Sequence, residues 1–132
     1  MTDEQQVTLF EAVGGRPFFD DLVDRFYAGV EADERLRPLY PDDLTESRLD
    51  LAEFLSQYWG GPPIYSDRKG HPRLRMRHGG FAIGEAEKTA WLTAMLAAVD
   101  AVTPPGDIRR ALVDYFEMAA THMINVRESP PS

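Results

Sequence analysis

Four segments of this chain carry apolar side chains at the spacing of an α-helix, and prolines and glycines separate them. The segments cover residues 17–30, about 45–59, 85–103 and 108–124. In each, the apolar positions gather on one side of a 3.6-residue period, which indicates an amphipathic helix. Since no strand-like alternation is present, the sequence predicts an all-α fold. The short connections predict that neighbouring helices run antiparallel.

The N-terminal part of the chain predicts a tight corner between two helices. A short amphipathic stretch around Leu9, Phe10 and Val13 precedes the pair Gly14-Gly15, and the first long segment follows at once. With 132 residues, of which 43% are hydrophobic, the chain can bury one substantial core. We therefore expect a single domain over residues 1–132, with residues 1–8 and 127–132 frayed.

Charge and composition exclude several classes of function. The formal net charge is −8, which argues against a nucleic-acid partner because phosphate contacts require a basic surface. The chain has no cysteine, so disulfides, thiolate catalysis and cysteine metal sites are excluded. Its first residues are polar and acidic, and no segment has the length and apolarity of a membrane span. We expect a cytoplasmic protein that makes no membrane contact.

The stretch between Ile64 and Gly80 shows no helical period and is strongly basic for an acidic protein. Only Asp67 opposes its cations, and a long irregular segment inside a small domain is usually functional. The basic residues and histidines of this stretch are Arg68, Lys69, His71, Arg73, Arg75, Arg77 and His78.

The three histidines do not have the spacing of a shared metal site. His71 precedes Pro72 and His122 lies in the last helical segment, so a surface or packing role is the simpler interpretation of each. His78 ends the basic run and is followed by Gly79-Gly80. It is either a solvated loop histidine or the single imidazole that an iron porphyrin requires. The basic run is likewise either a solvated loop or a partner for the two haem carboxylates.

Three aromatic residues with polar tips could line a ligand pocket. Tyr27 lies in the first long helical segment, Tyr40 in the corner that follows it, and Trp91 early in the third segment. Each is most simply a core residue, but each also requires a hydrogen-bond partner when buried. Together they could form a pocket for a polar ligand.

The sequence resembles the truncated haemoglobins of the second group, the two-over-two globins. The most specific strings are Gln-Tyr-Trp-Gly-Gly-Pro at 57–62 and Gly-His-Pro-Arg-Leu-Arg-Met-Arg-His at 70–78. Supporting strings in the same order are Phe-Glu-Ala-Val-Gly-Gly at 10–15, Arg-Phe-Tyr at 25–27, Leu-Arg-Pro-Leu-Tyr-Pro at 36–41 and Ala-Trp-Leu at 90–92. The resemblance extends from about Leu9 to Val126.

The resemblance implies a helical sandwich of the B and E helices over the G and H helices, with haem b (iron protoporphyrin IX) bound in a pocket. His78 would be the proximal ligand of the iron. Tyr27, Tyr40 and Trp91 would surround the distal ligand, and Ser47 and Leu51 would face the haem from the E helix. The remaining residues expected to contact the haem are Phe54, Tyr65, His71, Arg73, Arg75, Met76 and Phe81, with Tyr65, Arg73 and Arg75 the candidates for its propionates.

These residues predict a haem protein that binds dioxygen and other diatomic ligands. Bound dioxygen would accept hydrogen bonds from Tyr27, Tyr40 and Trp91, so its release should be slow. Slow release suits ligand capture with redox chemistry, either oxidation of NO or turnover of peroxide with electrons from an unidentified reductase. Reversible oxygen storage or transport is the alternative, and a cofactor-free helical interaction module is a third. CO would be a further ligand, and the oligomeric state, a homodimer included, is left open.

Overall fold

The computed structural model describes residues 7–69 and 84–123, and the four segments predicted to be helical are its four long helices. The prediction of an all-α fold is confirmed, since every regular element in these residues is a helix. The elements are α1 (Leu9–Ala12), α2 (Arg16–Ala32), the 3₁₀ turn η2 (Arg37–Leu39), α3 (Thr45–Tyr58), α4 (Ile64–Lys69), α6 (Glu85–Ala101) and α7 (Gly106–Met123).

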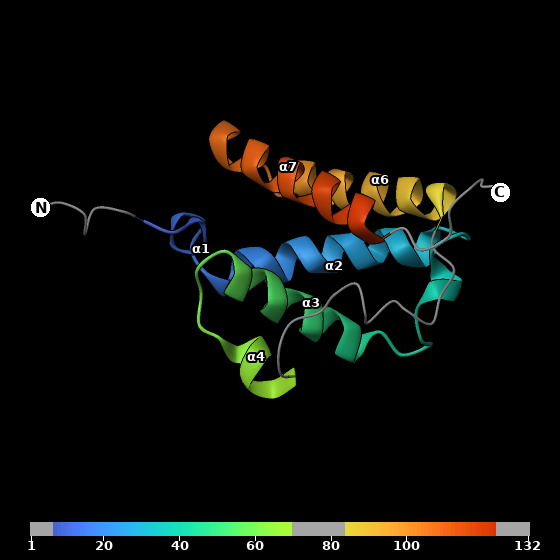
Figure 1. Cartoon of the computed structure of the whole chain (residues 1–132), viewed down its shortest axis with the longest axis horizontal. Coiled ribbons are helices and arrows are strands. Elements are labelled where there is room, and N and C mark those ends of the chain that lie inside the picture. Colours follow the sequence, from blue (N-terminus) through green and yellow to red (C-terminus); the bar gives the residue numbers. More distant parts are fainter. Residues whose placement is uncertain (1–6, 70–83, 124–132) are drawn as a thin grey trace, which may run out of the picture.

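The long helices form two antiparallel pairs. Helix α3 runs back along α2, and α7 runs back along α6 (Figure 1). Helix α2 packs against both α3 and α6, so it joins the two pairs. No helix in the described residues is long and apolar enough to cross a bilayer.

Helix α2 supplies the centre of the core. Its buried positions follow the helical period, and Phe19, Leu22, Phe26 and Val30 have no exposed surface. Burial of each such side chain contributes about 1.5–3 kcal/mol. The other side chains that are fully or almost fully buried include Leu36, Leu55, Met95, Val99, Leu112 and Phe116.

The predicted corner before α2 is confirmed. Thr8 caps α1, because its hydroxyl accepts the Glu11 N–H and the Glu11 carboxylate accepts the Thr8 N–H. Gly14 and Gly15 follow with φ of +93° and +88°, a region that favours glycine. The chain can therefore turn directly from α1 into α2.

Helix α1 packs against the end of α3 through a glycine. The Phe10 N–H donates to the Trp59 carbonyl at 3.0 Å. A Cβ atom at Gly61 would lie 2.8 Å from the Phe10 ring and 2.8 Å from the Ser56 carbonyl oxygen. There is thus no space for a side chain at this contact.

We expect Gly61→Ala to lower the free energy of unfolding by about 1–3 kcal/mol, because one of its two close neighbours is backbone and cannot rotate away. Urea denaturation measures the change. Gly106→Ala is the matched control, since no atom lies within 4 Å of a Cβ there. Equal stability of the two variants would show that the corner can relax.

Helix α4 corrects one prediction. Residues 64–69 were expected to be irregular, but they form a helix that packs against α3. Asp67 is the only acidic residue among the basic residues of its stretch, but the Arg68 guanidinium pairs with Asp50 and Glu53 of α3. The periodicity did not reveal α4 because polar contacts, rather than an apolar stripe, attach it to α3.

The buried side of α3 also differs from the expected one. The apolar residues that recur at helical spacing in the 45–59 segment are Leu51, Phe54, Leu55, Tyr58 and Trp59, which predicts that they share one buried side. Leu51 and Leu55 are buried, but Tyr58 is 51% exposed. Glu53 and Ser56 are buried instead. A six-residue helix packed beside these two residues explains why a polar side of α3 is shielded from water.

Candidate functional site

Tyr27 lies on the inner side of α2 and is 3% exposed. Its hydroxyl donates to the main-chain carbonyl of Ser47 in the first turn of α3 at 3.5 Å, a long contact. Its ring meets those of Phe26 and Tyr40 edge-on, with centroids 4.9 and 5.4 Å apart. Tyr27 therefore connects α2 both to α3 and to the corner that carries Tyr40.

An arginine organises the corner at Tyr40. The Arg37 guanidinium donates to the carbonyls of Tyr40, Pro41 and Asp42 at 3.3, 3.0 and 2.9 Å. Backbone groups in an irregular segment require hydrogen-bond partners, and Arg37 supplies one to each of these three consecutive carbonyls. Sequence reasoning did not identify Arg37, and its only signal was an arginine inside a proline-rich corner.

Trp91 reaches the same region from α6. The side chain is 7% exposed, and its ring lies edge-on to Phe26 and Phe116, with centroids 5.6 and 6.1 Å apart. Tyr27, Tyr40 and Trp91, which are far apart in the sequence, thus come together between α2, the η2 corner and α6.

The polar tips of these three residues interact with one another. Burial raises the pKa of Tyr40 to about 12, although hydrogen bonding with Trp91 and Tyr27 opposes the rise. Burial also raises the pKa of Tyr27, and Tyr40 and the negative charge of Asp50 raise it further. Both phenols are therefore protonated at neutral pH and can serve as hydrogen-bond donors.

The raised pKa values of Tyr40 and Tyr115 predict how stability depends on pH. Burial raises the pKa of Tyr115 in α7 to about 12 as well. In the unfolded chain tyrosine ionises near pH 10, so above that pH the unfolded state loses protons that the folded state keeps, and stability falls as the pH rises from about 10 to 12.

At pH 11, we expect the folded protein to show less tyrosinate absorbance than the protein unfolded in denaturant. The substitution Tyr115→Phe should reduce the rise in tyrosinate absorbance that accompanies unfolding. A folded state that ionises all its tyrosines near pH 10 would contradict the expected burial of these phenols.

The other predicted site residues in the described part of the chain belong to α3 and α4. Ser47 is half-buried, and its carbonyl rather than its hydroxyl contacts Tyr27. Leu51 is 9% exposed and lies one turn further along α3. Phe54 is half-buried, and its ring meets the buried ring of Tyr65 edge-on at 5.5 Å.

The remaining predicted residues are only partly covered by the structure. His122 is described: it is exposed on α7, and its Nδ1 lies 2.9 Å from the Met118 carbonyl oxygen, consistent with a surface role. The residues that lie outside the described part of the chain are His71, Arg73, Arg75, Met76, His78 and Phe81.

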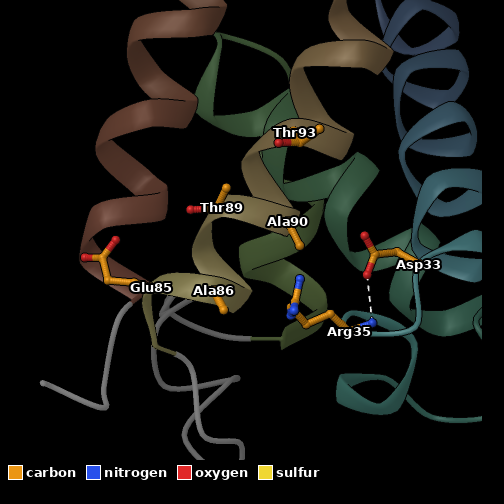
Figure 2. Close-up of a pocket in the computed structure, with 7 residues that line it drawn as sticks. All are labelled: Asp33, Arg35, Glu85, Ala86, Thr89, Ala90 and Thr93. Carbon is orange, nitrogen blue, oxygen red and sulfur yellow. Dashed lines mark hydrogen bonds between the residues drawn. The ribbon is translucent and has the colours of Figure 1, made fainter.

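A separate pocket of about 470 Å³ lies between the end of α2 and the N-terminal half of α6 (Figure 2). The Asp33 carboxylate accepts the Arg35 N–H at 2.7 Å, and the Arg35 side chain extends toward Ala86 and Ala90. Glu85, Thr89 and Thr93 complete the lining. Among the described residues, no predicted haem-site residue lines this pocket, and its mixed charges favour no class of ligand.

Comparison with known proteins identifies the family. The model of the bacterial-like globin family matches residues 8–125. The group 2 truncated hemoglobin YjbI of Bacillus subtilis is 42% identical over 120 residues, which are 91% of this chain and 90% of that protein.

Solved structures agree in both fold and sequence. A thermostable hemoglobin from the actinobacterium Thermobifida fusca is 50% identical, with a TM-score of 0.89 over 92% of this chain and 100% of that one. The group II truncated hemoglobin of Bacillus anthracis is 41% identical, with a TM-score of 0.89 over 95% and 96% of the two chains. The predicted two-over-two architecture is confirmed, and the chain belongs to the bacterial-like globin family as a group II truncated haemoglobin.

Proposed function

We propose that this protein binds haem b through His78 and holds dioxygen on the opposite side of the haem with Tyr27, Tyr40 and Trp91. Membership of the truncated globins implies haem-based binding of dioxygen and similar small ligands. The finer proposal rests on one observation, the convergence of two phenols and an indole from three parts of the fold. The role of His78 as the iron ligand is proposed from the sequence resemblance alone.

The described residues fit a haem on its distal side. Ser47, whose carbonyl accepts from Tyr27, and Leu51 are four residues apart on α3 and therefore lie on one side of the helix. Leu51 thus places one apolar side chain on the side of α3 that meets Tyr27, and distal polarity and donors decide what a haem binds. When bound, the haem would supply an iron that takes up a diatomic ligand.

The role of the three aromatic residues is to hold that ligand. Each can donate one hydrogen bond, and a donor directed at a partly charged acceptor contributes on the order of 1–3 kcal/mol. The three polar tips lie together before the ligand binds. The Tyr27 O–H, which donates to the Ser47 carbonyl, and the Trp91 N–H, which interacts with Tyr40, would turn from these acceptors to the ligand. Less side-chain ordering is then required on binding, which favours tight retention.

Tight retention favours ligand capture with redox chemistry over oxygen delivery. Oxidation of nitric oxide to nitrate would consume one dioxygen and one electron, and peroxide reduction to water would consume two electrons and two protons. A reductase would supply the electrons. Reversible oxygen storage is the alternative, and turnover assays with a reductase and NO or peroxide distinguish the two.

Absorption spectra of the purified protein in its ferric, dithionite-reduced and CO-bound forms test the proposal. A Soret band that shifts in each state is expected. A protein that stays colourless after addition of haemin would contradict haem binding and favour a cofactor-free helical module.

A further inference from the structure

The side chains that join α3 to α4 form a polar clamp, defined here as Asp50, Glu53 and Gln57 of α3 with Ser66 and Arg68 of α4. Arg68 Nη2 lies 2.6 Å from Asp50 Oδ1 and 2.7 Å from Glu53 Oε1, and its Nε donates to Glu53 at 2.9 Å. The amide of Gln57 donates to the Ser66 hydroxyl at 2.7 Å and accepts the Ser66 N–H at 2.9 Å. Five polar contacts thus hold one short helix.

Helix α4 needs such contacts in order to form. It has six residues, and isolated helices of that length are not stable in water. Its only fully buried side chain among those described is Tyr65, since Ile64 is 42% exposed. The polar clamp therefore holds α4 in place together with the packing of Tyr65.

Arg68 is the critical member of the polar clamp because of Glu53. The Glu53 carboxylate side chain is 9% exposed, and Glu53 also lines a small cavity of about 40 Å³ together with Ser56 and Ile64. A buried carboxylate is stable as an ion only when it is paired and hydrogen-bonded. Removing the guanidinium would leave a buried charge at the contact between α3 and α4.

The polar clamp lies directly beside the residues expected to contact haem. In the sequence, Asp50 directly precedes Leu51 and Glu53 directly precedes Phe54. Helix α4 holds Tyr65 against the Phe54 ring. A shift of α4 would therefore move Tyr65 relative to the Phe54 ring.

We propose that Arg68 is a positioning residue for haem, which holds α4 on α3 through Glu53 and Asp50 and thereby keeps Tyr65 and Phe54 in place beside the haem. This inference rests on the proposed haem binding. It predicts that loss of Arg68 weakens haem retention by more than the accompanying loss of stability explains.

The experiment measures haem transfer from the ferric protein to excess apomyoglobin, with thermal unfolding of each apoprotein in parallel. Arg68→Gln is expected to release haem at least about tenfold faster, the effect of losing one charged hydrogen bond. Arg109→Gln is the matched control, because it removes a similarly short pair to Asp100, at 2.7 Å, on the exposed surface. Its release rate should stay within about twofold, since exposed pairs contribute little.

A second control separates positioning from simple stability. Leu112→Ala removes a fully buried side chain from α7 and should destabilise the apoprotein at least as much as Arg68→Gln. We expect it to release haem more slowly than Arg68→Gln does, and Arg68→Lys to recover part of the loss. If release rates instead follow apoprotein stability across all variants, or if Arg68→Gln matches the unmutated protein, the inference is wrong. If the unmutated protein takes up no haem, the proposed function itself fails.

Discussion

Replacing His78 with alanine is expected to abolish the ordinary Soret spectrum and to leave the haem weakly held. Axial ligation sets the spectrum of a haem iron and anchors it to the protein. By resemblance to group II truncated haemoglobins, His78 would be that ligand, and the distal donors among the described residues are two phenols and an indole. Ferric, reduced and CO-bound spectra, together with haem content after gel filtration, measure the effect.

The matched control is His122→Ala. This histidine is exposed on α7, and its ring contacts only a main-chain carbonyl of the same helix among the described residues. Its spectra should equal those of the unmutated protein. Addition of imidazole should partly restore the spectrum of His78→Ala, because free imidazole can occupy the position of the missing side chain. A normal spectrum without His78 would assign the iron ligand to another residue.

Replacing Trp91 with phenylalanine is expected to accelerate dioxygen release about tenfold to a hundredfold. The substitution keeps an aromatic ring against Phe26 and Phe116 but removes the indole N–H that interacts with Tyr40. The loss of one donor to a partly charged acceptor costs about 1.5–3 kcal/mol, and each 1.4 kcal/mol corresponds to a factor of ten. Stopped-flow displacement of dioxygen measures the rate.

Trp59→Phe provides the control for this effect. The Trp59 indole N–H lies at the end of α3 and has no hydrogen-bond partner among the described residues. Its removal should leave dioxygen release unchanged. If both tryptophan variants release dioxygen at the original rate, the distal network does not retain the ligand, and reversible oxygen storage becomes the better interpretation.

Much of the fold could be predicted from the sequence because its signals are local. The period of apolar residues in α2 places Phe19, Leu22 and Phe26 on one side, and burial follows from that period. The glycine pair at 14–15 predicts the corner because few other residues adopt a positive φ. The family strings then assigned Tyr27, Tyr40 and Trp91 to one site.

Other features depend on contacts between segments that no local pattern encodes. Helix α4 is held on α3 because Arg68 donates to Glu53 and Asp50 and because Ser66 both accepts from and donates to the Gln57 amide. A six-residue helix has too few residues to show a period. Arg37 organises the corner at Tyr40 through three contacts with main-chain carbonyls. These contacts could not be predicted from a single arginine in the sequence.

The sequence by itself determined the four long helices and the corner, because periodicity and backbone preference are local properties of the chain. The family strings predicted which residues lie on the distal side. Only the tertiary structure decided that Glu53 is buried, that Tyr58 is exposed, and that the Ser47 carbonyl rather than its hydroxyl meets Tyr27. The physical reason is that burial and hydrogen-bond partners depend on which segment packs against which, and the packing of α4 on α3 reverses what the polarity of those side chains predicts.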